Sequence, residues 1–222
     1  MKRILLVKTS SLGDVIHCLP VINDIRSHYP DILIDWVVED SFADIPRMHP
    51  HVNKILTVSM RRWKKSIFSF KTWLEISTFK KAIKDHQYDA VIDCQGLLKS
   101  ALITRQALTN LKGLKHGYDK NSIREPIASQ FYEKVHAISY QQHAVTRNRT
   151  LCAMSLNYSN PTNPPDYGIN AAKCELALAN NLILALHGTS RDSKLWPIEC
   201  WVNLGKALAK QNINLALPWA ND

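Results

Sequence analysis

Short apolar runs, separated by polar turns, set the pattern of the chain. The first run, residues 4–7, leads through a polar turn into apolar residues at helical spacing: Val15, Leu19, Ile22 and Ile25. A short unbroken apolar run is typical of a strand that is buried on both faces of a sheet. Strands are predicted at this run and at five further stretches rich in apolar residues, namely residues 32–38, 55–58, 88–93, 182–186 and 214–217.

Helical spacing recurs between these predicted strands. Pro20 predicts a kink or an early end of the first helix, because proline has no amide hydrogen to donate. On the next helix, four apolar residues are expected to form a core stripe; they are Trp73, Ile76, Phe79 and Ile83. Further helices are predicted through Leu102, Ile103 and Leu108, over residues 124–132 and 141–156, and from Pro197 onward.

Strands that alternate with helices predict parallel βαβ units, so the expected fold class is α/β. Right-handed crossovers bring the turns that follow the strands to one edge of the sheet, which is where ligands bind. We therefore expect residues 10–14, Glu39 and residues 95–96 to lie close together.

The domain organisation follows from a Pro- and Asn-rich stretch at residues 159–168, which predicts a linker. It separates an N-terminal Rossmann-like domain, residues 1–158, from a second α/β unit, residues 169–222. The second unit carries the pattern of one βαβ unit, so we expect it to be an incomplete domain.

Composition narrows the class of protein. The 222 residues are 45% hydrophobic and 21% charged, which is ordinary for a soluble protein. The net charge of +9 favours an acidic partner such as nucleic acid, anionic lipid or a phosphorylated substrate. No segment approaches the roughly 20 consecutive apolar residues needed to cross a bilayer. The five cysteines and nine histidines show no ligand spacing, so we expect reduced thiols, a cytosolic protein and no metal site.

Candidate chemistry begins in the turn after the first strand. Ser10, Ser11 and Gly13 are expected to turn the chain, and Asp14 to open the helix. An acid at the carboxyl edge of a sheet, beside backbone amides, is suited to act as a catalytic base. Asp is also a preferred residue for capping a helix, and from the sequence alone capping is the simpler interpretation.

A second polar turn follows the predicted strand at residues 182–186 and contains Thr189, Ser190 and Lys194. A helix N-terminus there would offer amides and a favourable dipole to a phosphate, and Lys194 would add a positive charge. The stretch is neither a Walker A loop nor a G-x-G-x-x-G fingerprint. The sequence fits a phosphate-binding site and an ordinary polar loop equally well.

Four cations surround a tryptophan within five residues; they are Arg61, Arg62, Lys64 and Lys65. A charge run is normally a solvated face, but this clustering favours a loop that binds carboxylates or phosphates. The nearby Phe68 and Phe70 predict a loop or a lipid-facing surface.

Several of these stretches together resemble one family, the heptosyltransferase I group of glycosyltransferase family 9. The resemblance is carried in collinear order by residues 8–20, 35–39, 61–65, 88–100, 124–129, 141–145 and 189–197. It implies a GT-B fold with two Rossmann-like domains. It also implies an inverting, metal-independent enzyme without a cofactor, which moves L-glycero-D-manno-heptose from ADP-heptose to Kdo of Kdo2-lipid A.

The resemblance also implies roles for individual residues. Asp14 would be the general base on the acceptor hydroxyl, and Lys194 would offset the charge on the leaving diphosphate. The donor-binding residues would be Ser10, Ser11, Gly13, Thr189, Ser190 and Lys194. The acceptor-binding residues would be Arg61, Arg62, Lys64, Lys65, Gln95, Arg124 and His143.

Members of the family continue further into the second domain, so we expect this chain, taken by itself, to bind donor poorly and to turn over little. The implied setting is the cytoplasmic face of the inner membrane of a Gram-negative bacterium, where a monomer without nucleic-acid partners makes peripheral contact with anionic lipid. Two alternatives stay open: a related heptosyltransferase that acts on a later core heptose, and a non-catalytic module that docks on anionic lipid.

Overall fold

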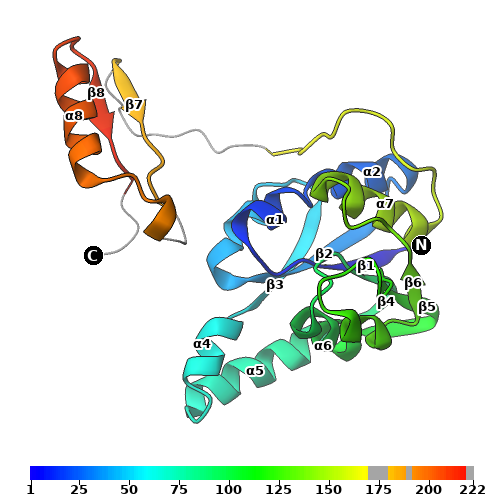
Figure 1. The fold of residues 1–222 in the computed structure, drawn as a ribbon. Coiled ribbons are helices and arrows are strands. Elements are labelled where there is room, and N and C mark those ends of the chain that lie inside the picture. Colours follow the sequence, from blue (N-terminus) through cyan, green and yellow to red (C-terminus); the bar gives the residue numbers. More distant parts are fainter. Residues whose placement is uncertain (170–179, 189–191, 219–222) are drawn as a thin grey trace. The chain divides into compact units, whose positions relative to one another are not determined.

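The computed structural model of the chain describes residues 1–169, 180–188 and 192–218. The chain divides into two compact units, Met1–Ala172 and Lys173–Asp222, which are taken separately below (Figure 1). None of the helices in these described ranges is long and apolar enough to span a membrane.

The first unit is built on one six-stranded sheet with the order β3-β2-β1-β4-β5-β6, and all of its strand pairs are parallel. This order reverses direction between β1 and β4, which makes the gap beyond their carboxyl ends the switch point where such sheets bind ligands. The strands are β1 (Arg3–Val7), β2 (Leu33–Glu39), β3 (Val52–Val58), β4 (Gln87–Asp93), β5 (Leu108–Tyr118) and β6 (Lys134–His136).

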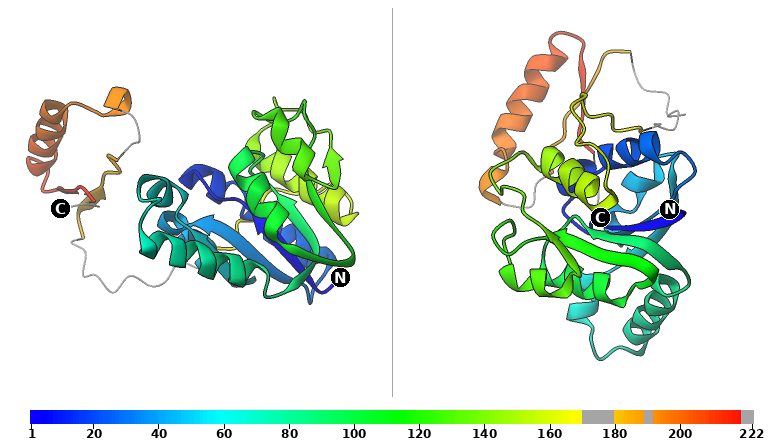
Figure 2. Two further views of the ribbon diagram at one scale, coloured as in Figure 1. Left: turned by 90° about the horizontal axis from the view of Figure 1, so that it is seen from below. Right: turned by 90° about the vertical axis from the view of Figure 1, so that its right-hand side faces the viewer.

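Helices cover both faces of this sheet, as the right-hand view of Figure 2 shows. Those packed on one face include α2 and α7, and those on the other include α5 and α6. The α-helices are α1 (Leu12–Ile16), α2 (Pro20–His28), α3 (Asp44–Arg47), α4 (Met60–Lys65), α5 (Phe70–Ile83), α6 (Leu98–Gln106) and α7 (Ala144–Leu156). The 3-10 helices are η1 (Asp40–Phe42) and η2 (Pro126–Phe131).

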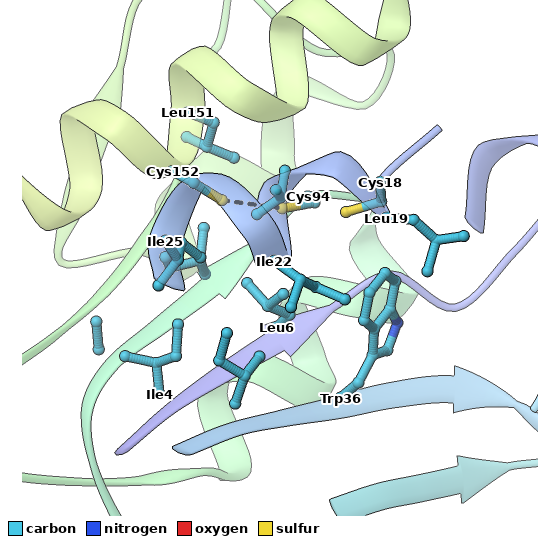
Figure 3. Close-up of a cluster of buried hydrophobic side chains, with 14 of the residues drawn as sticks. Ile4, Leu6, Cys18, Leu19, Ile22, Ile25, Trp36, Cys94, Leu151 and Cys152 are labelled. Carbon is cyan, nitrogen blue, oxygen red and sulfur yellow. Dashed lines mark hydrogen bonds between the residues drawn. The ribbon is translucent and has the colours of Figure 1, made fainter. Parts of the chain in front are cut away.

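The apolar run of β1 is fully buried because alternate side chains enter two different cores. Ile4 and Leu6 pack with α2 and α7, while Leu5 and Val7 pack with α4, α5 and α6. Figure 3 shows the first of these cores around Trp36, with sulfur atoms from three distant segments of the chain. Burial of both faces therefore explains why residues 4–7 of this strand are all apolar.

The predicted break in the first helix is confirmed, since α1 ends at Ile16 and α2 begins with Pro20 at its first position. Gly13 was expected in the turn but lies inside α1, which starts one residue earlier at Leu12. The turn itself is made by the residues before Ser11, which is the N-cap of α1.

Three further expectations need correction. Residues 61–65 lie in helix α4 rather than in a loop, and Trp63 is the buried side chain of that helix. Trp73 is 55% exposed and therefore does not belong to the core stripe, which Phe79 and Ile83 do form. The predicted helix at residues 124–132 is the shorter 3-10 helix η2.

Strands β5 and β6 were not predicted, and the helix expected to reach Leu108 ends at Gln106. The segment that forms β5 lacks an apolar run, because lysines and glycines interrupt it. Gly117 is required by packing, since a Cβ there would lie 2.2 Å from Cε2 of Tyr132.

The second unit contains two parallel strands, β7 (Leu182–Leu184) and β8 (Asn214–Ala216), and helix α8 (Ile198–Ala209). A short 3-10 helix, η3 (Asp192–Lys194), precedes α8. The strand at residues 182–186 was expected to be buried, but Leu184 is 61% exposed. Ile183, the central residue of β7, is 41% exposed as well.

Candidate active site

The turn after β1 fixes a carboxylate at the switch point of the sheet. Ser11 caps helix α1, and the carboxylate Oδ2 of Asp14 accepts hydrogen bonds from the amide of Ser11 at 2.9 Å and from its hydroxyl at 2.8 Å. Asp14 is thus the reciprocal partner of a capping box rather than the cap itself. The carboxylate stays partly accessible beyond the end of the strand.

The surroundings of Asp14 favour its ionised form. Desolvation by partial burial acts to raise the pKa, but the two hydrogen bonds from Ser11 and the charges of Lys8 and His17 outweigh it. As a result the pKa of Asp14 lies below its usual value of 3.8. A carboxylate that is ionised at neutral pH and partly accessible can accept a proton.

The turn after β4 holds the turn after β1 in place through Gln95. The amide oxygen Oε1 of Gln95 accepts hydrogen bonds from the backbone amides of Thr9 at 3.2 Å and Ser10 at 3.1 Å. Glu39, at the end of β2, donates its amide to the carbonyl of Thr9 at 3.0 Å. The three turns expected to converge therefore do so.

A buried acid organises the turn that carries Gln95. Oδ1 of Asp93 accepts the amides of Gln95 at 2.8 Å and Gly96 at 3.1 Å, and Oδ2 accepts the hydroxyl of Tyr132 at 2.8 Å. Burial is the largest influence and raises the pKa of Asp93 to about 6 despite these hydrogen bonds. Gly96 has φ +67°, and a Cβ there would lie 2.7 Å from Ile123, so glycine is required at this turn.

A polar cavity of about 300 Å³ opens at this point of the first unit. Five of the residues predicted from the sequence line it; they are Ser10, Ser11, Asp14, Gln95 and Arg124. Lys8 also lines it and is almost fully buried, with its ammonium donating to the carbonyl of Cys94 at 2.8 Å. The cavity therefore places one carboxylate among several cations.

The cavity wall also contains residues that were not anticipated from the sequence, among them Tyr118, Tyr140, Arg147 and Asn148. The guanidinium of Arg147 lies between the rings of Tyr118 and Tyr140, 4.7 Å from each centroid. Stacking on two aromatic faces holds this planar cation in a fixed orientation. These residues come from β5, from the loop before α7 and from α7 itself, so nothing local in the sequence brings them together.

The basic run on α4 does not line this cavity, and its members differ in their surroundings. Arg62 donates to Glu75 at 2.9 Å and to the hydroxyl of Ser59 at 3.0 Å, so its guanidinium is already engaged. Arg61 and Lys64 line a separate groove of about 620 Å³. Lys65 is exposed at the end of the helix.

The remaining predicted residues lie elsewhere. His143 is the N-cap of α7, where its Nδ1 accepts the amide of Val145 at 3.3 Å. Gly13 is exposed in α1. Lys194 ends the 3-10 helix η3 of the second unit, and Thr189 and Ser190 lie outside the described residues.

The histidine and cysteine side chains form no metal site in the described part of the chain. Within residues 1–169, 180–188 and 192–218, no group of three or more His, Cys, Asp or Glu side chains is placed to hold a metal ion. The cysteines at positions 18, 94 and 152 are scattered in the sequence but gather in one core, where the sulfurs of Cys94 and Cys152 lie 3.9 Å apart (Figure 3). They are free thiols.

The strand order and the cavity at the switch point define the first unit as a Rossmann-like α/β domain with its binding site at the carboxyl edge of the sheet. Comparison with known proteins identifies the family within this fold class. Residues 76–222 match the family model described as "Glycosyltransferase family 9 (heptosyltransferase)".

Individual relatives agree with the family model. The chain is 44% identical over 220 residues to lipopolysaccharide heptosyltransferase 1 of Salmonella typhimurium and 47% identical over 221 residues to the protein of that name from Escherichia coli. Each match covers 98% of this chain and 68% of the relative. The solved structure of E. coli heptosyltransferase WaaC with ADP is 45% identical, with a TM-score of 0.87, and the match covers 99% of this chain and 68% of that chain.

The chain therefore belongs to glycosyltransferase family 9, the heptosyltransferases. The expected α/β fold with Rossmann-like units of the GT-B type is confirmed by the same likeness. E. coli heptosyltransferase II, at 18% identity and a TM-score of 0.70, shares the fold.

Proposed function

We propose that this protein transfers L-glycero-D-manno-heptose from ADP-heptose to Kdo of Kdo2-lipid A, with inversion at the anomeric carbon. The observation that carries the proposal is the ionised carboxylate of Asp14, held by Ser11 in a cation-lined cavity at the switch point of the sheet. The relatives named above supply the sugar and nucleotide class, through heptosyltransferase 1 and the complex of WaaC with ADP.

In this mechanism a Kdo hydroxyl attacks the anomeric carbon of the donor while Asp14 takes the hydroxyl proton. The new glycosidic C–O bond forms as the bond from the anomeric carbon to the diphosphate breaks, and ADP leaves from the opposite face. Asp14 suits the role of base because its pKa lies below its usual range, so it is deprotonated at neutral pH. This route requires neither a metal nor a cofactor.

The acceptor is proposed to bind to the first unit. Arg124 lines the cavity beside Asp14 and can form paired hydrogen bonds with a Kdo carboxylate. Gln95 lines the cavity, and His143, the N-cap of α7, directly precedes Ala144 of the cavity wall. The phosphates of lipid A would be attracted by cations on α4, namely Arg61, Lys64 and Lys65, with Arg62 in a supporting role.

Donor-binding residues are proposed in each unit separately. Lys194, with Thr189 and Ser190, would offset charge on the diphosphate as it leaves. Ser10, Ser11 and Gly13 would approach the donor from the turn after β1, where a Cβ at Gly13 would meet no atom within 4 Å. The net charge of +9 supports peripheral attachment of a monomer to the anionic cytoplasmic face of the inner membrane.

A second candidate function is a non-catalytic module that binds an anionic glycolipid. It is favoured by one observation: the cavity with Asp14 and Arg124 is built from the first unit alone. Calorimetric titration with ADP and with a Kdo–lipid A analogue separates the two when it uses the 222-residue chain continued by the segment of its E. coli relative beyond the match. The 222-residue chain by itself is expected to bind ADP poorly under either candidate function. Binding of the analogue without ADP would favour the module, binding of both with turnover of ADP-heptose would favour the transferase, and binding of neither would contradict both.

A further inference from the structure

An apolar groove with a basic rim lies beside the candidate active site, between α4, α5 and α6 of the first unit. Its volume is about 620 Å³. Trp63 and Phe79 form part of its floor, with ring centroids 6.3 Å apart, and Leu102 and Ile67 stand on its walls. We call it the α4–α6 groove.

The charged side chains that line the groove are all positive. Four cations line it, Arg61, Lys64, Lys80 and Lys99, and its lining contains no carboxylate. None of the four forms an ion pair with a residue in the described part of the chain. An apolar trough with unneutralised cations at its rim is complementary to a molecule that joins a hydrocarbon chain to an anionic headgroup.

One end of the groove adjoins the cavity of Asp14. The ammonium of Lys99, on the groove wall, donates to the hydroxyl of Ser10 at 2.8 Å, and Ser10 lines the cavity. From the other side, the amide of Arg61 donates to Glu39 at 3.4 Å, and Glu39 in turn bonds Thr9. A ligand whose headgroup occupied the cavity could therefore continue into the groove.

Apolar side chains continue outward from the groove. The segment between α4 and α5, residues 66–69, contains Ile67, which lines the groove, and Phe68, which is 99% exposed. Phe70, the first residue of α5, is 83% exposed. Exposed phenylalanines on a cationic segment are suited to contact with hydrocarbon rather than with water.

We propose that the α4–α6 groove binds one acyl chain of an anionic glycolipid whose headgroup reaches the Asp14 cavity. This inference rests on the proposed acceptor, and it assigns to that acceptor a second subsite that holds hydrocarbon. The chain would bury apolar surface along Leu102 and Ile67, and the headgroup phosphates would lie against the cations of the rim.

The test uses dodecyl phosphate below its micelle concentration, with butyl phosphate as the short-chain comparison, titrated into the 222-residue chain by calorimetry. The wild-type chain is expected to bind dodecyl phosphate at least about tenfold more tightly than butyl phosphate. Leu102→Glu places a carboxylate on the groove wall and is expected to remove that advantage. Met154→Glu on α7 is the matched control, because both side chains are 44% exposed on helices, and it should bind like wild type.

Equal affinity for the two phosphates, or unchanged binding by Leu102→Glu, would overturn the groove assignment. If Leu102→Glu does not fold, as judged by circular dichroism, Ile67→Glu on the opposite wall replaces it, since Ile67 is half-exposed.

A fully deacylated Kdo–glucosamine phosphate analogue distinguishes the groove from the proposed acceptor. Leu102→Glu should bind that analogue as wild type does. If the analogue does not bind while dodecyl phosphate binds in a Leu102-dependent way, the groove stands and the proposed acceptor fails. If the analogue binds and dodecyl phosphate does not, the groove assignment fails alone.

Discussion

The carboxylate of Asp14 accepts both the amide and the hydroxyl of Ser11, at 2.9 and 2.8 Å. Sequence reasoning set two interpretations of Asp14 against each other, helix capping and proton transfer. The pair shows that they are compatible, because the capping box fixes the carboxylate and keeps it ionised while leaving it partly accessible. The helix start and the proposed base are the same structural feature.

Ser11→Ala removes the hydroxyl donor and keeps the backbone donor. Because a hydrogen bond to the charged form lowers a carboxylate's pKa, its loss should raise the pKa of Asp14. A base works only when deprotonated, so the acid limb of the pH–rate profile for heptose transfer should move to higher pH. Ser27→Ala, which removes a hydroxyl bonded to the carbonyl of Asp24, is the control. An acid limb in the same place for wild type and Ser11→Ala would contradict this.

Gln95 is a positioning residue whose single oxygen orders two amides of the turn after β1. Gln95→Ala leaves the amides of Thr9 and Ser10 without that partner, and should lower the free energy of unfolding by about 1–2 kcal/mol. It should also weaken binding of the Kdo analogue about tenfold. Gln95→Glu keeps an acceptor oxygen and should restore the free energy of unfolding, as followed by denaturant unfolding. Its added negative charge should leave binding of the Kdo carboxylate weak, as followed by calorimetry. Failure of Gln95→Glu to restore the turn would contradict the positioning role.

The central strands of the first unit were predicted from their apolar residues, which are buried on both faces of the sheet. Residues 4–7 are an unbroken apolar run and residues 90–92 another, because β1 and β4 lie in the middle of the sheet. In contrast β5 carries lysines and glycines, and β6 has three residues, so neither offers a periodic apolar signal. Likewise α4 was mistaken for a loop because a single buried side chain, Trp63, anchors it.

Residues of the candidate site could be predicted where they lie in a turn that follows a predicted strand. Asp14 and Gln95 follow predicted strands directly, so the carboxyl-edge rule places both. Arg147 and Tyr118 could not be found this way, because their stacking at 4.7 Å depends on α7 packing against β5. Lys8 gave no signal because a buried lysine directly after a strand looks like any surface lysine in the sequence.

Asp93 should make the stability of the first unit fall as pH rises. Burial raises its pKa in the folded state to about 6, above the usual 3.8, so the folded protein binds this proton more tightly than the unfolded one. The stabilisation is complete below pH 3.8 and is lost as pH rises through about 6, by up to about 3 kcal/mol.

Asp93→Asn isolates this effect. Asparagine keeps an oxygen for the amides of Gln95 and Gly96 and does not titrate. The difference in unfolding free energy between wild type and Asp93→Asn, measured by denaturant titration from pH 4 to 7, should therefore change steadily in favour of the variant. A difference that is constant across this range would contradict the raised pKa.

Arg124 and Arg62 were both predicted to bind acceptor, and the structure separates them. Arg124 is exposed in the cavity wall, whereas Arg62 is held by Glu75 and Ser59. Arg124→Ala should weaken binding of the Kdo analogue about tenfold, and Arg62→Ala should change it less than about twofold. Calorimetry on both variants measures this directly, and the reverse order would contradict the placement of the acceptor in the Asp14 cavity.

The central claim is that Asp14 is the base for heptose transfer. Because the chain spans 68% of its E. coli relative, the assay uses the 222-residue chain continued by the segment of that relative beyond the match. Asn at position 14 keeps an oxygen for both hydrogen bonds from Ser11, so Asp14→Asn should melt at the wild-type temperature.

The measurement is the rate of heptose addition to Kdo2-lipid A, followed by mass spectrometry. The wild-type chain is expected to form the product, and Asp14→Asn to be slower by at least about a hundredfold, in the range of a lost general base. A near-wild-type rate for Asp14→Asn would contradict the account.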